Sequence, residues 1–493
     1  MTLRLLLIEA NDNARWVGAR VGPKVHVLPI ALMGLAAHAR SVCPTLEVRI
    51  VETSFDAPTD QALAGIIEDF APTWIGVRSI SLFIDEVRRI VGLVKRTTEA
   101  PLLLGGPIAT ALGRKLFDDV EGLSYIAIGE GEPILAELVN GRALREIRGV
   151  ECREASAQPG LRAAKSPAPP LDDLPLPSYD LVDLGHYEQA LSYAYNHRRQ
   201  GVLVTSRGCP YSCTYCFQIS DAAARLQSTA RVLRDIRQLH DDFGVEDFYI
   251  VDDLFNLKRR RALEVFDALI EAKLNIRLYF VNGLRVDLCD EAFVDRMVSA
   301  GTVWVTYAIE SACPRVQVLI KKEIELTGAR RMINYTQRQG IVVNVNTMFG
   351  FPTETPVEAQ MTLDYLGSLD HPSLLPYHFN LRGYPGCEIV EQADQAGWKR
   401  ETFLATGFSS YGDLPAGSPT FTRHEMLQHM LSFHEHYGLA NRAHLEYSVR
   451  TLRHIGYRDV EIVDMYTVLM NRQFQSVDEL LTGKRDAVSA RWA

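Results

Sequence analysis

The sequence predicts an α/β protein with two successive parallel sheets followed by a helical C-terminal region. From the N-terminus to about residue 400, short apolar runs alternate with segments whose apolar residues recur at helical spacing, which is typical of β–α units. A stretch rich in alanine, proline and serine at 151–177 divides this alternation into two series. We therefore expect a first domain at 1–145, a connector at 146–200, a second domain at 201–400 and helices at 401–493.

The first series contains five β–α units, which imply a doubly wound parallel sheet. The expected strands cover 3–10, 47–52, 74–77, 102–104 and 125–128, and the expected helices cover 29–42, 59–70, 82–96, 111–117 and 133–139. Ligands of such sheets bind beyond the carboxyl ends of the strands. Three of these ends are rich in glycine or serine, and they include Ser79, Gly105, Gly106, Gly129 and Glu130. Small residues there admit a bulky planar ligand, and they fit tight turns between strand and helix equally well.

The second series has six β–α steps and predicts a parallel sheet that curls into a partial barrel. Its expected strands cover 201–205, 248–251, 276–281, 303–309, 342–348 and 377–381, and its helices cover 229–243, 259–272, 291–300, 328–339 and 356–368. Three further helices are expected at 421–437, 441–455 and 460–470. The histidines in this last region match no zinc-binding spacing, so we expect surface or lid residues at His424, His429, His434, His436, His444 and His454. Two roles fit Tyr411, Tyr437 and Tyr447: they line a substrate pocket, or they pack in the core.

Composition limits the classes of function. Of the 493 residues, 47% are hydrophobic and 23% charged, and the formal net charge of −9 argues against a general nucleic-acid binder. No apolar run approaches the ~18 residues of a membrane span, and the N-terminus runs directly into a strand, so we expect no membrane span and a cytoplasmic location. Five cysteines show no pairing pattern, which fits a reducing compartment; they are Cys43, Cys152, Cys289, Cys313 and Cys387.

The other three cysteines form the most specific motif of the chain. Cys209, Cys213 and Cys216 have the spacing C-x3-C-x2-C and directly follow the first strand of the second series. A structural zinc site uses four ligands, and no fourth cysteine or histidine lies within this loop. Three thiolates instead suit an iron–sulfur cubane that keeps one iron open. One alternative is a zinc knuckle that a distant residue completes. The other is that the three cysteines lie in a hydrophobic core by chance.

This spacing, with the aromatic residues Tyr215 and Phe217 beside the last cysteine, resembles the motif of the radical S-adenosylmethionine (SAM) superfamily. The resemblance implies that Cys209, Cys213 and Cys216 hold a 4Fe-4S cluster and act as catalytic residues. The open iron would chelate SAM and deliver one electron to its sulfonium, giving a 5'-deoxyadenosyl radical. The resemblance also implies an external electron donor such as flavodoxin or ferredoxin, and a small-molecule substrate.

The first 140 residues resemble the cobalamin-binding, Rossmann-like domain that precedes the cluster domain in cobalamin-dependent radical SAM enzymes. The similar segments are 29–35, 105–110 and 128–132, and 171–187 resembles the family's connector. The resemblance implies cobalamin at the strand ends that carry Ser79, Gly105, Gly106, Gly129 and Glu130. The chain has no D-x-H-x-x-G pattern, and Ile108 stands where many relatives have histidine. Bound cobalamin is therefore expected to lack a histidine on its lower face.

The strand ends of the second domain match the SAM site of the same family. The matching residues are Asp252, Asp253, Glu310, Ser311, Asn346, Gly350 and Arg382. The resemblance implies that the two aspartates bind the amino group of SAM and that Glu310 and Ser311 face its ribose and methionine parts. Asn346 and Gly350 would support the adenine, and Arg382 belongs to a later rim segment. Helix capping is the alternative for any one of them.

The favoured function is a cobalamin-dependent radical SAM methyltransferase that acts on an unactivated carbon of a small biosynthetic intermediate. One SAM would methylate the cobalamin, and a second would yield the radical that activates the substrate for transfer from methylcobalamin. One alternative is a radical cyclase, rearrangement or carbon–carbon coupling enzyme that does not methylate, with or without cobalamin. Another is a non-catalytic iron–sulfur or zinc module.

Overall fold

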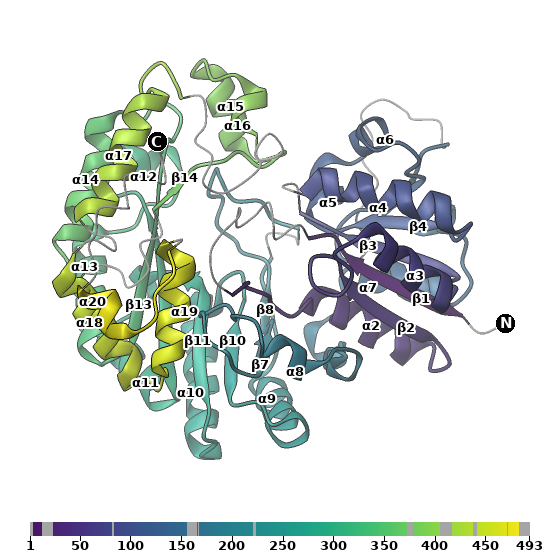
Figure 1. Ribbon diagram of the computed structural model, residues 1–493, viewed down its shortest axis with the longest axis horizontal. Helices are drawn as coiled ribbons and strands as arrows, with labels where there is room; N and C mark the ends of the chain where they lie inside the picture. The colour runs from purple at the N-terminus through teal and green to yellow at the C-terminus, as the bar shows by residue number, and fades with distance from the viewer. Residues whose placement is uncertain are drawn as a thin grey trace.

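Two six-stranded sheets organise the protein, and they lie side by side in the computed structural model (Figure 1). The structure describes residues 3–11, 23–80, 83–154, 165, 167–219, 223–371, 378–404, 417–436, 441–470 and 472–482. Within these residues, no helix is long and apolar enough to cross a membrane.

The first sheet has the strand order β2-β1-β3-β4-β5-β6. Its strands are β1 Arg4–Glu9, β2 Glu47–Glu52, β3 Trp74–Arg78, β4 Leu102–Gly105, β5 Tyr125–Ala127 and β6 Val150–Cys152. The first five are parallel, and the strand order reverses between β1 and β3. Such a reversal opens a crevice at the carboxyl ends of the strands. The predicted doubly wound sheet is confirmed, with an additional antiparallel edge strand, β6, that is too short to be recognised in the sequence.

Alternate residues of each strand feed two separate cores, one on each face of this sheet. Leu5 and Leu7 belong to one core, and Leu6 and Ile8 belong to the other. The helices around the sheet are α2 Ile30–Val42, α3 Asp60–Phe70, α4 Ile84–Thr97, α5 Pro107–Leu112, α6 Lys115–Asp119 and α7 Glu132–Val139. The prediction of one helix at 111–117 is wrong, because Gly113 adopts a φ of 55° and separates α5 from α6.

The second sheet has the order β14-β13-β12-β11-β10-β7, and all neighbouring strands are parallel. Its strands are β7 Gln200–Leu203, β10 Asp247–Ile250, β11 Arg277–Leu284, β12 Thr302–Glu310, β13 Val342–Phe349 and β14 His378–Asn380. The helices that connect them are α9 Thr229–Phe243, α10 Arg259–Ala272, α11 Glu291–Ser299, α12 Pro314–Leu319, α13 Leu326–Arg338 and α14 Pro356–Gly367. Since β7 and β14 do not pair, the barrel is open, and the predicted partial barrel is confirmed.

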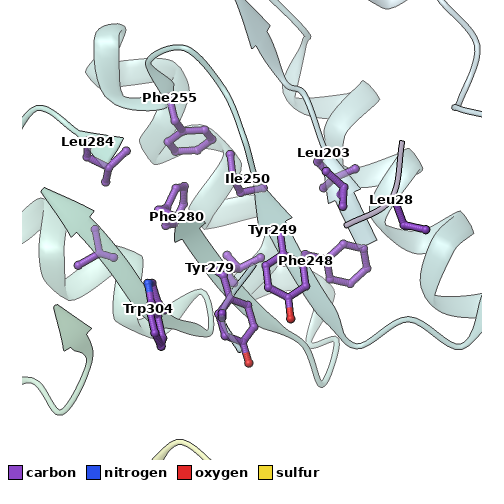
Figure 2. Close-up of a cluster of buried hydrophobic side chains, with 14 of the residues drawn as sticks. Leu28, Leu203, Phe248, Tyr249, Ile250, Phe255, Tyr279, Phe280, Leu284 and Trp304 are labelled. Carbon is purple, nitrogen blue, oxygen red and sulfur yellow. The ribbon is translucent and has the colours of Figure 1, made fainter. Parts of the chain in front are cut away.

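Aromatic side chains fill both faces of the barrel strands (Figure 2). Phe280 packs against Phe255 with ring centroids 4.9 Å apart, whereas the adjacent Tyr279 stacks on Tyr249 at 4.7 Å on the other face. This alternation lets each strand contribute to the packing of the outer helices and of the barrel interior at once.

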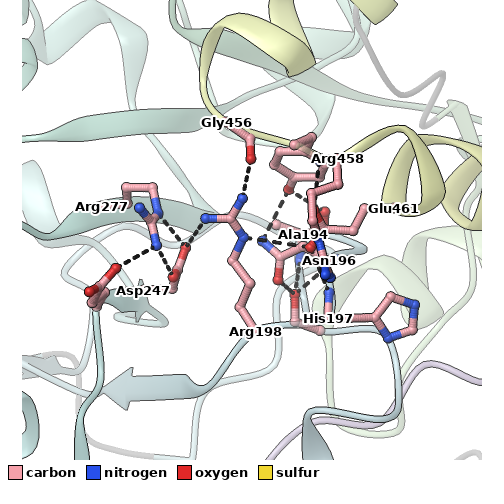
Figure 3. A network of polar contacts seen from close by, with 12 residues as sticks. Ala194, Asn196, His197, Arg198, Asp247, Arg277, Gly456, Arg458 and Glu461 are labelled. Atoms are coloured by element: carbon pink, nitrogen blue, oxygen red, sulfur yellow. Dashed lines mark hydrogen bonds and ion pairs between the residues drawn. The ribbon is translucent and has the colours of Figure 1, made fainter.

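The C-terminal helices are tied to the barrel end from which the strands begin (Figure 3). Asp247, at the start of β10, accepts a hydrogen bond from Tyr279 at 2.6 Å and pairs with Arg277 and Arg198. Arg198 also donates to the carbonyl of Gly456, between two C-terminal helices. The remaining elements are α8 Leu184–Tyr187, α15 Glu388–Gln395, α16 Arg400–Phe403, α17 Arg423–His436, α18 Arg442–His454, α19 Asp459–Met470 and α20 Val477–Thr482.

Two of the C-terminal histidines lie inside the protein. His429 in α17 and His444 in α18 are buried, so the expectation of surface or lid histidines is wrong for them. His429 lies 2.7 Å from His378 of β14, Nε2 to Nε2, and burial lowers its pKa to about 4. His424 and His454 are exposed. Outside the described residues lie Tyr411, Tyr437 and the side chains of His434 and His436.

Candidate active site

The three cysteines lie in a loop at the carboxyl end of β7. The loop is flanked by a short antiparallel ribbon, β8 Ser206–Arg207 and β9 Arg225–Leu226. Cys209 and Cys213 are partly buried and Cys216 is exposed. Desolvation of the sulfur within the loop and the neighbouring thiols of Cys213, Cys387 and Cys209 raise the pKa of Cys216 to about 12. The Cys216 thiol therefore resists deprotonation beside the other sulfurs, and a metal centre bound by the three cysteines would favour its thiolate form.

A fourth thiol, that of Cys387, lies beside this loop. Cys387 is buried, and burial raises its pKa to about 12. It directly precedes α15, where the amide of Ile389 donates to the carbonyl of Thr214 at 2.9 Å. Nothing in the local sequence links Cys387 to the motif. Among the described residues, no three His, Cys, Asp or Glu side chains form a group that could hold a single metal ion.

The two aspartates after β10 hold the start of the cysteine loop. The buried Asp252 carboxylate accepts hydrogen bonds from Thr205 Oγ1 at 2.6 Å and Ser206 Oγ at 2.8 Å, as well as from the Thr205 amide. Asp253 accepts from the Gly208 amide at 2.7 Å. Burial raises the pKa of Asp252, and the surrounding donors oppose that shift. Both oxygens of Asp252 are engaged in positioning the loop, whereas Asp253 also borders an open cavity.

Tyr215, inside the motif, belongs to a buried polar triad with Glu310 and Lys322. Its hydroxyl lies 3.1 Å from Glu310 Oε1, and Lys322 Nζ lies 3.0 Å from both of these oxygens. Burial and the Glu310 carboxylate raise the pKa of Tyr215 well above its usual value, so the phenol stays protonated. Glu310 adopts a φ of 70°, a conformation that costs energy for a non-glycine residue. The Glu310 carboxylate is thus held at the cysteine motif by the hydrogen bond from Tyr215 and the ion pair with Lys322.

The other residues expected at the SAM site lie at the same edge of the barrel. Ser311 is buried, and its hydroxyl accepts from the Cys313 amide at 3.2 Å at the start of α12. Asn346 is paired in register with Ala308 near the end of β13. Arg382 follows β14, is buried, and donates to Asn380 at 3.2 Å.

Gly350 begins a tight turn closed by Glu354, and this turn gives a pH prediction. The buried Glu354 carboxylate accepts from the amides of Gly350 at 2.6 Å and Phe351 at 3.1 Å, and burial raises its pKa from 4.5 to about 8. Between these values the folded protein keeps a proton that the unfolded chain loses, so this group's stabilisation is complete at low pH and is lost as pH rises to about 8. Its contribution falls by up to about 1.4 kcal/mol per pH unit.

We expect Glu354→Gln to flatten this dependence, because the amide keeps a hydrogen-bond acceptor and does not ionise. Denaturant unfolding at several pH values between about 5 and 8 measures the free energy of unfolding for both proteins. The wild-type curve should fall more steeply than that of the variant. If the free energy of unfolding depends on pH equally in both proteins, the raised pKa does not belong to Glu354.

A cavity of about 400 Å³ separates the carboxyl ends of the two sheets. The first sheet contributes glycine-rich lining, and the barrel contributes residues on both sides of the cysteine motif. The lining includes Gly34, Gly76, Gly105, Gly106, Gly129, Glu130, Gly131, Ser206, Arg207, Phe217 and Asp253. The structure therefore brings four of the five residues expected at the cobalamin site to the same cavity as Phe217 and Asp253. Ser79 is not among the lining residues, and its hydroxyl donates to the Ala10 carbonyl at 3.3 Å.

This lining fits a large, flat ligand. A Cβ atom built on Gly106 would lie 2.9 Å from the Ser79 carbonyl oxygen, so the turn after β4 requires glycine. A Cβ atom on Gly34, in α2, would meet no atom within 4 Å. Small residues on one wall and Phe217 on the other leave space for a planar group between them.

Sequence patterns did not reveal two of the charged residues in this region. Lys322 follows α12, a helix too short to be expected, and it pairs with Glu310 at the end of β12 because α12 returns the chain to that strand end. Arg207 lies two positions before Cys209, and this proximity to the motif was the only available signal. Its partners are Glu130, in the loop after β5, and Glu132, at the start of α7.

The sequence is similar to one domain family and to several known proteins. Residues 203–366, which begin at the end of β7 and cover most of the barrel, match the model of the radical SAM superfamily. An uncharacterized methyltransferase of Pyrococcus horikoshii is 27% identical over 407 residues, which cover 80% of this chain and 83% of the relative. Cytidylyl-2-hydroxyethylphosphonate methyltransferase of Streptomyces wedmorensis is 28% identical over 345 residues, which cover 62% of this chain and 64% of the relative.

Solved structures share the two-sheet architecture. The radical SAM methyltransferase TsrM of Kitasatospora setae, solved with cobalamin and a 4Fe-4S cluster, superposes with a TM-score of 0.63 at 21% identity and covers 80% of this chain and 79% of its own. The cobalamin-dependent radical SAM enzyme OxsB, solved with aqua-cobalamin, gives 0.66 at 15% identity over 95% of this chain and 72% of its own. At these identities the likeness concerns the fold. The cysteine motif lies inside residues 203–366, which are similar to the radical SAM superfamily, and the fold of the two sheets together is similar to that of enzymes solved with cobalamin.

Proposed function

We propose that the protein is a cobalamin-dependent radical SAM methyltransferase that transfers a methyl group to an unactivated carbon of a small molecule. One observation carries the proposal: a single cavity has the glycine-rich ends of the first sheet on one side and Arg207 and Phe217, which flank the cysteine motif, on the other. Two reactive groups bound at these places would face each other across that cavity. The methyltransferases among the relatives support the same conclusion.

The residues present fit both groups. Cys209, Cys213 and Cys216 would hold a 4Fe-4S cluster, and the loops around Gly105 and Gly129 would hold cobalamin. When bound, the cluster supplies the electron that cleaves SAM, and cobalamin carries the methyl group. The protein's own contribution is positional: Asp252 holds the start of the cysteine loop, and Phe217, next to Cys216, lines the cavity.

Charged groups suited to SAM surround the motif. Asp253 presents a carboxylate at the cavity edge for an ammonium group. Glu310 offers acceptors for ribose hydroxyls, and Lys322 balances its charge. The buried triad with Tyr215 keeps these groups fixed before any ligand arrives, so little ordering remains to be done on binding.

Cobalamin bound to this protein is expected to lack a protein histidine on its lower face. None of the described residues that line the cavity is a histidine. In the electron paramagnetic resonance spectrum of the bound cobalt(II) form, no splitting from an imidazole nitrogen of the protein should appear. Protein labelled with ¹⁵N-histidine provides the control: its spectrum should be identical to that of unlabelled protein, and a change in splitting would contradict the expectation.

The test of the proposed function is anaerobic reconstitution with iron, sulfide and hydroxocobalamin, followed by desalting, metal analysis and assay with SAM and a reductant. A reduced flavodoxin or ferredoxin is the proposed natural donor. Retained cobalt and iron, with formation of 5'-deoxyadenosine and S-adenosylhomocysteine in the presence of substrate, support methyl transfer. Failure to retain cobalt would overturn it.

A second candidate is a radical enzyme that does not methylate its substrate. The anaerobic magnesium-protoporphyrin IX monomethyl ester cyclase of Rubrivivax gelatinosus is 24% identical over 298 residues, which cover 59% of this chain and 53% of the relative. The same assay separates the two functions, because such an enzyme would form 5'-deoxyadenosine without a matching amount of S-adenosylhomocysteine.

A further inference from the structure

Two glutamates of the first sheet and two arginines of the barrel meet at the edge of the cavity. Arg207 places one guanidinium nitrogen 2.9 Å from Glu130 and another 2.8 Å from Glu132, and Arg225 also pairs with Glu130. The side chains of Glu130 and Glu132 are only 7% and 5% exposed, and those of the arginines are about a quarter exposed. We call these four residues the arginine clamp.

The clamp is part of the cysteine loop. Arg207 lies two residues before Cys209, and the intervening Gly208 donates its amide to Asp253. Arg207 and Arg225 are register partners in the β8–β9 ribbon, whose two strands enclose the loop. If a bound 4Fe-4S cluster orders the cysteine loop, it therefore also fixes the positions of the Arg207 and Arg225 guanidinium groups.

The clamp is also part of the cavity. Glu130, Glu132 and Arg207 all line it, as does Phe217, which directly follows Cys216. If the loop loosens, the cavity loses its barrel wall and the buried glutamates lose the guanidinium that they share. Buried carboxylates are stable only with such partners, so the two sheets would separate more easily at this edge.

We propose that the arginine clamp couples the two cofactor sites, so that filling either one raises the affinity of the other. The inference rests on the proposed function, in which the cavity binds cobalamin. Because coupling between two binding sites is reciprocal, a loaded cysteine loop must strengthen cobalamin binding by the same factor by which cobalamin strengthens retention of the cluster. Arg207 is thus a positioning residue that acts through the cysteine loop on one side and through the buried glutamates on the other.

The experiment measures the dissociation constant of hydroxocobalamin anaerobically for the full-length protein before and after cluster reconstitution. For the wild type we expect binding to be about fivefold or more weaker before reconstitution, the lower end of common coupling strengths. In Arg207→Met the two constants should become equal. Iron lost to a chelator gives the reciprocal measurement, and added hydroxocobalamin should slow this loss in the wild type but not in Arg207→Met.

Arg277→Met is the matched control. The Arg277 side chain is 24% exposed and pairs with Asp247, whose side chain is 4% exposed, at the opposite end of the barrel. This variant loses a comparable ion pair and should keep the coupling. Glu132→Gln removes one contact of Arg207 and leaves Glu130 in place, so it should reduce the coupling partially, and it remains informative should Arg207→Met fold poorly.

The outcomes separate the two proposals. Reconstituted wild type that binds no hydroxocobalamin overturns the proposed function. Tight binding that is the same with and without the cluster overturns the coupling and leaves the function intact. Loss of coupling in Arg277→Met to the same degree as in Arg207→Met would show general loosening and would overturn the role of the clamp.

Discussion

Replacing Cys209, Cys213 or Cys216 with alanine is expected to abolish SAM cleavage and to leave little iron after anaerobic reconstitution. A cubane held by three thiolates has no spare protein ligand, so loss of one thiolate opens a second iron to solvent. We expect no detectable formation of 5'-deoxyadenosine in these variants. Iron analysis and the absorption spectrum of each variant, compared with wild type reconstituted in parallel, provide the measurement.

Cys387→Ala is the control for this prediction, because it tests whether the cluster has three cysteine ligands or four. The Cys387 thiol is buried beside the motif and is near enough to affect the pKa of Cys216. A cluster with three protein ligands should survive its removal with normal iron content and SAM cleavage. If Cys387→Ala instead loses iron as the motif variants do, the cluster has four protein ligands, no iron is open to SAM, and the proposed radical chemistry is excluded.

Most of the fold was predictable because its signals are local. Buried parallel strands are short continuous apolar runs, and helices such as α3 and α9 have capping residues and apolar positions at helical spacing. Elements of a few residues gave too little periodicity: α12, the β8–β9 ribbon and β6 were not expected. The burial of His429 was also hidden, because it depends on α17 packing against β14 and not on any pattern within α17.

The residues of the candidate site were also predictable only where their signals are local in the sequence. The cysteine motif was visible because its members lie within eight positions of one another. The Glu310–Lys322 ion pair and the arginine clamp join segments that meet only after folding; Glu130 and Arg207 are 77 positions apart in the chain. Sequence spacing identifies residue types suited to a ligand, but it does not show which carboxylates are already paired. Asp252, expected at the SAM amino group, is the clearest example, since both of its oxygens accept hydrogen bonds from the cysteine loop.

Gly34→Leu is expected to abolish cobalamin binding while leaving the cluster intact. Gly34 lies in the middle of α2 and lines the cavity, and a Cβ atom at this position meets no atom within 4 Å. Leucine is also a better helix former than glycine, so the helix should not lose stability. The new side chain would occupy space that the proposed ligand needs, and we expect the affinity for hydroxocobalamin to fall by about 100-fold or more, which corresponds to about 2.8 kcal/mol.

Gly65→Leu tests whether this effect is local. Gly65 is also a helical glycine whose added Cβ would meet no atom within 4 Å, but it lies in α3, on the other side of the first sheet, and does not line the cavity. This variant should bind hydroxocobalamin as the wild type does. Since Gly34→Leu leaves the barrel untouched, its reconstituted protein should still bind iron and cleave SAM without transferring a methyl group. Unchanged cobalamin affinity in Gly34→Leu would mean that the ligand binds elsewhere, and loss of affinity in both variants would mean that the first sheet tolerates neither substitution.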